Sequence, residues 1–190
     1  MRNIWTYAEH IREGLRTFSS EEREPELYGV EGDETDFRGE TLEYLVVRYE
    51  SIENVDFTLA QIFNGDFDDS FFGSCNFNGV RFKGTKIKDV EFESCSMGGA
   101  SFTALRNFTG NSFKNCDLRY TLFDSWAIEN SIQSIDGRRV YSLSFLGCDL
   151  TGSNILNFID SEFVHDKMFD GEVGELVRKK RRSRSAFGRF

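Results

Sequence analysis

Large apolar residues recur at every fifth position through most of this chain. In NGDFDDSFFGSCNFNGVRFKG, residues 64–84, a phenylalanine stands at each of four such positions. The five-residue series runs unbroken through fourteen such positions from Phe37 to Phe102, resumes one residue late at Phe108, and returns after a second gap at Phe145. A five-residue spacing matches neither the 3.6-residue period of an α-helix nor the two-residue period of a single strand.

Each of these large apolar residues forms the centre of a five-residue repeat, and a second, smaller residue accompanies each repeat centre. Two positions before the centre the residue is usually small or apolar, as in Ala60, Gly65, Ser70 and Cys75. Residues two apart on extended backbone point to the same side, so each unit directs one large and one small side chain inward and then turns a corner. Four units would close a square coil of about 20 residues, and coils would stack at the strand spacing of ~4.8 Å. The pattern therefore predicts an all-β coil with a narrow apolar interior.

The best-formed units resemble those of a known family. The closest units are VDFTL (55–59), GDFDD (65–69), CNFNG (75–79), CDLRY (116–120) and CDLTG (148–152). They are similar to the pentapeptide-repeat family, whose consensus is roughly A-(D/N)-L-X-X with Leu or Phe at the centre. The resemblance covers about residues 35–157, and it implies a right-handed quadrilateral β-helix of about five to six coils.

The cysteines test the register within the sequence. They are Cys75, Cys95, Cys116 and Cys148, separated by 20, 21 and 32 residues. The first separation equals one coil of 20 residues. The second equals one coil plus the extra residue that precedes Phe108. The third exceeds one coil by about a dozen positions, so an excursion of that length between Ile128 and Phe145 would place all four cysteines in one ladder.

The local sequence favours such an excursion. ENSIQSIDGRRV is polar and contains the turn signal Asp136-Gly137. A shorter interruption would keep Ile135 and Val140 in register, but it would not align Cys148 with the other cysteines. We therefore predict the longer excursion.

The chain divides into four predicted regions. Trp5, Ala8, Ile11, Leu15 and Phe18 recur at helical spacing and predict an amphipathic helix that caps the first coil. The regions are an N-terminal capping helix with an acidic linker (1–34), the β-helix with an inserted loop near 129–140 (35–157), a C-terminal cap (158–177) and a basic tail (178–190).

Charge is distributed unevenly over the 190 residues, whose net charge is −9. Residues 1–170 carry −14 and residues 171–190 carry +5, while residues 31–70 alone carry −10. Residues 71–128 carry +2, with four bases clustered in one coil: Arg81, Lys83, Lys86 and Lys88. No apolar run has the roughly 20 residues of a membrane span, and charges interrupt the N-terminal segment where a signal peptide would be apolar. We expect a soluble, cytoplasmic protein with reduced thiols.

The sequence contains no recognisable catalytic or metal-binding motif. It has no nucleophile elbow, phosphate-binding glycine loop, HExxH or CxxC pair. Asp56, Asp66 and Asp117 directly precede repeat centres. At such positions the carboxylate points outward and can accept a hydrogen bond from the chain at a corner of the coil. His165 beside Asp166 has no identifiable nucleophile. We expect no enzyme activity, no cofactor and no metal.

The family resemblance suggests a binding function. Its best-understood members are bacterial DNA-mimicking proteins that bind type II topoisomerases such as gyrase, some through loops that project from the coils. The corresponding acidic residues here are Asp36, Glu40, Glu43, Asp56, Asp66, Asp68 and Asp69. The candidate loop residues are Asp136, Arg138 and Arg139. We expect a protein partner, with the oligomeric state left open between monomer and dimer.

A structural adaptor is the alternative function. Its anchor would be the basic tail, which can bind phosphates without reading sequence or can bind an acidic partner. The tail residues are Arg178, Lys179, Lys180, Arg181, Arg182 and Arg184.

Overall fold

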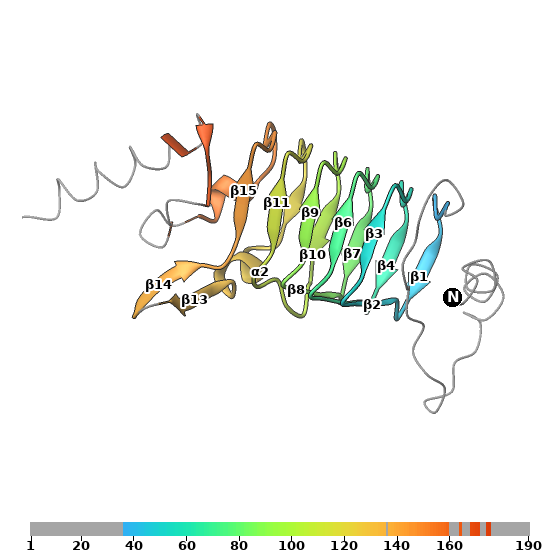
Figure 1. Cartoon of the computed structure of the whole chain (residues 1–190), viewed down its shortest axis with the longest axis horizontal. Helices are drawn as coiled ribbons and strands as arrows, with labels where there is room; N and C mark the ends of the chain where they lie inside the picture. Colours follow the sequence, from blue (N-terminus) through green and yellow to red (C-terminus); the bar gives the residue numbers. More distant parts are fainter. Residues whose placement is uncertain (1–35, 136, 160–163, 165–167, 172–173, 176–190) are drawn as a thin grey trace, which may run out of the picture.

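The chain winds into a four-sided coil whose turns stack along one axis (Figure 1). The computed structural model describes residues 36–135, 137–159, 164, 168–171 and 174–175. Each five-residue unit forms one short strand or bridge and lies on one face, so that four units complete a turn. The faces are numbered here in chain order.

Three faces are parallel sheets and one is a column of single bridges. The first face consists of bridges that join Asp36, Asp56, Asn76, Ser96, Asp117 and Asp149 in sequence. The second face contains β1 (Thr41–Glu43), β4 (Gln61–Phe63), β7 (Arg81–Lys83), β10 (Ser101–Thr103) and β12 (Leu122–Phe123). The third face contains β2 (Val46–Arg48), β5 (Asp66–Asp68) and β8 (Lys86–Lys88). The fourth face contains β3 (Ser51–Glu53), β6 (Phe71–Gly73), β9 (Glu91–Glu93), β11 (Ser112–Lys114) and β15 (Ser144–Leu146).

The strand register confirms the predicted coil. Leu42 pairs with Ile62, and Ile62 pairs with Phe82, each one predicted coil further along the chain. The five-stranded second and fourth faces come close to the predicted five to six coils. Phe102 then pairs with Phe123, one position later than the regular step, as the extra residue before Phe108 requires.

The extra residue is Arg106, which lies at the corner between the second and third faces. Its backbone N–H donates to the carbonyl of Thr85. Its guanidinium extends along the corner and donates to three carbonyls of the two preceding coils: Gly84 (2.6 Å), Asn64 (3.1 Å) and Gly65 (3.0 Å). The inserted residue therefore links three successive coils.

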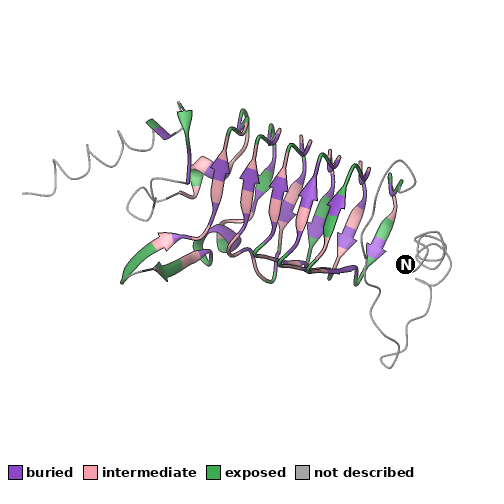
Figure 2. Cartoon of the chain, viewed as in Figure 1, coloured by how far each residue is buried: buried purple, intermediate pink, exposed green. Residues whose placement is uncertain are grey.

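The repeat centres fill the interior with stacked side chains (Figure 2). Most outward strand residues are half-buried or exposed, whereas Val46 of β2 and Gly73 of β6 are buried. The fourth face contributes the longest stack, with ring centroids 5.0–5.5 Å apart, through Phe72, Phe92, Phe113, Phe145 and Phe169. Offset aromatic pairs of this kind add about 0.5–1.5 kcal/mol each beyond the area that they bury.

Residues at the corners have left-handed backbone conformation, and the side chain of a corner residue can extend toward the following coil. Tyr120 has φ +59°, and its ring lies over Gly152 at the same corner one coil further on. A Cβ at Gly152 would lie 2.4 Å from Tyr120 Cδ1, and this glycine also has φ +72°. Glycine is needed there for space as well as for its conformation.

All four cysteines form the predicted ladder. Each thiol donates to the carbonyl of a repeat centre in the preceding coil; for Cys148 the acceptor is Phe113, at 3.4 Å. None of the four forms a disulfide. The ladder confirms the longer excursion before Phe145, because Phe145 pairs directly with Phe113 and the chain between the two coils is left outside the register.

The excursion is an ordered element that projects from the coil (Figure 1). It begins with the short helix α2 (Ser125–Glu129) and continues as an antiparallel hairpin of β13 (Ile132–Ile135) and β14 (Arg138–Tyr141). Ser142 closes its base, since the hydroxyl donates to the carbonyl of Ser131 (2.7 Å) and accepts from the N–H of Gly110 (2.9 Å).

The C-terminal end of the β-helix continues beyond the last complete repeat unit. The 3-10 turn η1 (Ile155–Asn157) follows the last complete unit, and Phe169 forms a further bridge to Phe145. The predicted N-terminal helix, the acidic linker and the basic tail lie outside the described residues. Within the described part, no helix is long and apolar enough to cross a membrane.

Candidate interaction surfaces

The acidic residues of β5 lie in an ion-pair ladder on the third face. Asp66 contacts Arg48 of the preceding coil (2.6 Å) and Lys86 of the following coil (3.2 Å). Asp68 contacts Lys86 (2.7 Å) and lies 3.7 Å from Lys88. The sequence places these charges in register, because β2, β5 and β8 pair one coil apart. The third face is therefore largely neutralised by its own side chains.

The Asp66 carboxylate is held in its charged form. Burial alone would raise its pKa, but hydrogen bonds from Arg48 and Lys86 outweigh burial and lower the pKa below its ordinary value. The Asp66 and Asp68 side chains are only 19% and 18% exposed. One oxygen of each carboxylate has no hydrogen bond, but each of those oxygens faces a lysine ammonium. These carboxylates thus present little free charge to a partner.

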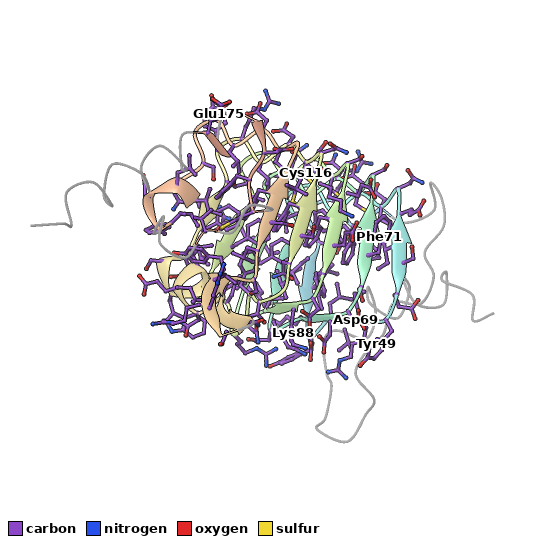
Figure 3. All side chains as sticks on the ribbon, turned by 60° about the vertical axis from the view of Figure 1, so that its left-hand side comes forward. Tyr49, Asp69, Phe71, Lys88, Cys116 and Glu175 are labelled. Atoms are coloured by element: carbon purple, nitrogen blue, oxygen red, sulfur yellow. The ribbon has the colours of Figure 1, made fainter. Side chains whose placement is uncertain are left out.

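The remaining predicted acids lie on different sides of the coil. Asp36 and Asp56 lie on the first face, where Arg38 contacts Asp36 at 2.6 Å and lies 3.9 Å from Asp56. Glu43 is exposed on the second face in β1, and Glu40 precedes that strand. Asp69 is exposed at the corner between the third and fourth faces, next to Lys88 in Figure 3. The seven predicted acids therefore do not form one cluster.

The fourth face holds an aromatic platform that sequence reasoning did not identify. Phe71, labelled in Figure 3, is half-buried, and its ring occupies the space that a side chain of Gly73 would fill. A Cβ at Gly73 would be 2.8 Å from Phe71 Cε1 and 3.1 Å from Cζ. The missing side chain of Gly73 leaves the space that the ring occupies.

Two carboxylates flank this platform. Glu53 and Glu93 pair with Gly73 from the preceding and following strands, so each lies one strand spacing away in the same column. Neither forms an ion pair with any residue in the described ranges, whereas the neighbouring Glu91 is engaged by Lys114. The equal one-coil steps from Glu53 to Gly73 to Glu93 were the signal in the sequence that could have revealed this column.

The second face carries the opposite charge. Arg81 and Lys83 of β7 are exposed, and neither contacts a carboxylate among the residues that the structure describes. Lys86 and Lys88 of β8, in the same coil, are both paired with aspartates. The four bases that the sequence groups together thus fall on two faces, with one pair neutralised and one pair free.

The hairpin presents two of its three predicted residues. Arg138 and Arg139 are exposed in β14, beside the turn at Gly137. Asp136 lies outside the described residues, as do the tail residues Arg178, Lys179, Lys180, Arg181, Arg182 and Arg184. No group of three His, Cys, Asp or Glu side chains in the described part is arranged to hold a metal ion.

A comparison with protein families supports the repeat architecture. The family model for the pentapeptide repeat region matches residues 51–123. Among solved structures, QnrB1, a plasmid-mediated fluoroquinolone resistance protein, is 16% identical, and the match covers 82% of this chain and 96% of that chain with a TM-score of 0.25. HetL from the cyanobacterium Nostoc sp. strain PCC 7120, a pentapeptide repeat protein involved in heterocyst differentiation regulation, is 19% identical over 77% of this chain and 62% of that chain, with a TM-score of 0.29.

A third similar structure is Rfr23, a pentapeptide repeat protein from the cyanobacterium Cyanothece 51142. It is 8% identical, and the match covers 80% of this chain and 94% of that chain with a TM-score of 0.29. A search of curated proteins found no match. Over residues 51–123 the chain therefore matches a pentapeptide repeat region, and the five-residue register and four-sided coil of the structure are consistent with that match.

Proposed function

We propose that this protein is a non-catalytic binding rod whose partner is a basic, DNA-handling protein such as a type II topoisomerase (gyrase). The observation that carries the proposal is the fourth-face platform, where the Phe71 ring lies between Glu53 and Glu93, two carboxylates that form no salt bridge with any residue that the structure describes. This platform replaces Asp66 and Asp68 as the expected centre of contact, because those two carboxylates are already neutralised.

The platform suits a cationic side chain of a partner. An arginine guanidinium can stack on a phenylalanine ring, which contributes about 0.5–1 kcal/mol at an exposed site. The carboxylates on both sides would accept its N–H groups, in the planar geometry that arginine provides. Because backbone pairing fixes the strands that carry these three residues, only their side chains need to be ordered when a partner binds.

The wider surface supports a partner that normally binds DNA. Residues 31–70 carry a net charge of −10, of which Asp66 and Asp68 are offset by Lys86 and Lys88 of the next coil. The remaining negative charge would attract a basic DNA channel over a distance. Exposed Asp69 extends the negative surface from the platform to the adjacent corner. The hairpin of β13 and β14 projects from the coil and would contact a protein surface outside such a channel.

The proposal is tested by titrating the purified protein into a gyrase supercoiling assay. We expect the wild-type protein to change supercoiling. In a Glu53→Gln/Glu93→Gln variant, the concentration for half effect should rise about tenfold, as expected if the charge contacts of exposed Glu53 and half-buried Glu93, roughly 0.5–1 kcal/mol each, are lost.

A matched control separates local contact from total charge. Glu43→Gln/Glu129→Gln removes two exposed acids from other parts of the surface, and its half-effect concentration should stay within about twofold of wild type. An equal shift in both variants would show that net charge alone matters. A wild-type protein that neither alters supercoiling nor binds the enzyme would refute the topoisomerase proposal.

A further inference from the structure

The second face combines free cations with hydrogen-bonding groups over three consecutive strands. Arg81 and Lys83 are the outward residues of β7, and Gln61 and Ser101 pair with Arg81 from the strands on either side. Thr103 pairs with Lys83, and its hydroxyl lies 3.3 Å from the Ser101 hydroxyl. Both cations are exposed and lack ion pairs in the described ranges, although every other outward lysine on a described strand is paired.

We infer that the second face binds an extended acidic segment of a partner polypeptide. Residues two apart on a strand point to the same side and lie roughly 6.6 Å apart. Alternate glutamates or aspartates of an extended segment have the same spacing, so each carboxylate meets one of the two cations. The Ser101 and Thr103 hydroxyls and the Gln61 amide then donate to the remaining carboxylate oxygens.

Charge favours a peptide over a nucleic acid at this face. The whole chain carries −9, and Glu43 lies in the same column as Lys83, two strands away. A nucleic acid carries a phosphate at every nucleotide and would extend past the two cations into these negative surroundings. A short acidic segment needs to place only two carboxylates. The inference rests on Arg81 and Lys83 and does not depend on the partner proposed for the opposite face.

The probe for the test is a labelled decapeptide in which glutamate alternates with serine, added to the full chain at low and moderate salt. We expect salt-sensitive binding that weakens at least about fivefold in Arg81→Gln/Lys83→Gln, as for the loss of two exposed charge contacts. Lys88→Gln/Arg119→Gln is the matched control, since it removes two cations that are already paired with aspartates. Its affinity should stay within about twofold of wild type.

A second measurement locates the bound peptide. A carbodiimide joins a glutamate of the peptide to a nearby lysine amine as an amide, with loss of water, and mass spectrometry identifies the lysine. A crosslink at Lys83 supports the inference. Crosslinks confined to Lys179 and Lys180, an equal loss in the control variant, or tighter binding of a ten-nucleotide oligothymidine at the same cations would each overturn it.

Discussion

The single residue that interrupts the repeat provides a strong test of the fold. Deleting Arg106 would shorten the spacing between Phe102 and Phe108 from six to five residues and restore one continuous register. Asn107 would then occupy the position of Arg106, and its N–H would donate to the carbonyl of Thr85. We expect the deletion variant to fold, although single-residue deletions inside regular structure usually disrupt it.

The expected cost follows from the contacts of the Arg106 guanidinium. It makes three hydrogen bonds to carbonyls, at 2.6, 3.0 and 3.1 Å. At an exposed site these are worth about 0.5–1 kcal/mol each. Ordering a long side chain offsets up to about 2 kcal/mol of that sum. The net loss of unfolding free energy should be about 1 kcal/mol, and Arg106→Ala should show a similar loss.

Urea denaturation followed by circular dichroism measures this difference, with deletion of Glu93 as the control. That deletion reduces the spacing between Phe92 and Met97 to four and puts every later centre out of register. It should abolish cooperative unfolding. The reasoning would be refuted if deletion of Arg106 unfolded the protein, or if deletion of Glu93 were equally well tolerated.

Three further predictions concern the core, the hairpin and pH. Phe92→Leu should lower the unfolding free energy measured in urea titrations by about 2–3 kcal/mol. The reason is that the Phe92 ring stacks between those of Phe72 and Phe113, with ring centroids 5.3 and 5.0 Å away. A loss under about 1 kcal/mol would contradict this role. Ser142→Ala removes two hydrogen bonds at the base of the hairpin, so limited proteolysis near Gly137 should become faster while the main unfolding transition changes little. The pKa of Asp66 is lowered in the folded state, so the stability that it contributes is present above its unfolded pKa of about 3.9 and is lost as pH falls further. The advantage of wild type over Asp66→Asn in urea should therefore be present at pH 7 and shrink below about pH 4.

Sequence reasoning could predict the coil because one geometric rule governs it throughout. A centre such as Phe82 must fill the interior, and its neighbours are fixed one coil away on either side. The cysteine spacing then determined the length of the excursion, since Cys148 could join the ladder only if the surplus positions before it left the coil. The fold was predictable because the same five-residue spacing must hold at each repeat, so many positions support one register.

The charge of each face was less predictable, because a count of charges along the sequence does not show which residues are neighbours in space. Asp66 and Lys86 are distant in sequence but adjacent on the third face, so their charges cancel in space. The same one-coil step brings Glu53 and Glu93 to the two sides of Gly73. The placement of the Phe71 ring in the space beside Gly73 depends on side-chain orientation, which repeat spacing does not specify.

If the rod binds a basic DNA channel as proposed, the opposite charges of its second and fourth faces limit how it can do so. In a four-sided coil these faces point in opposite directions, with Arg81 and Lys83 on one and Glu53 and Glu93 on the other. A duplex is negative on all sides, so a basic channel that encloses DNA would attract the fourth face and repel the second. Binding would therefore be one-sided, with the fourth face against the cations and the second face directed away from them or toward an acidic segment. A rod bound in this way would compete with DNA for only one wall of the channel, and its orientation about the coil axis would be determined by charge before any close contact forms.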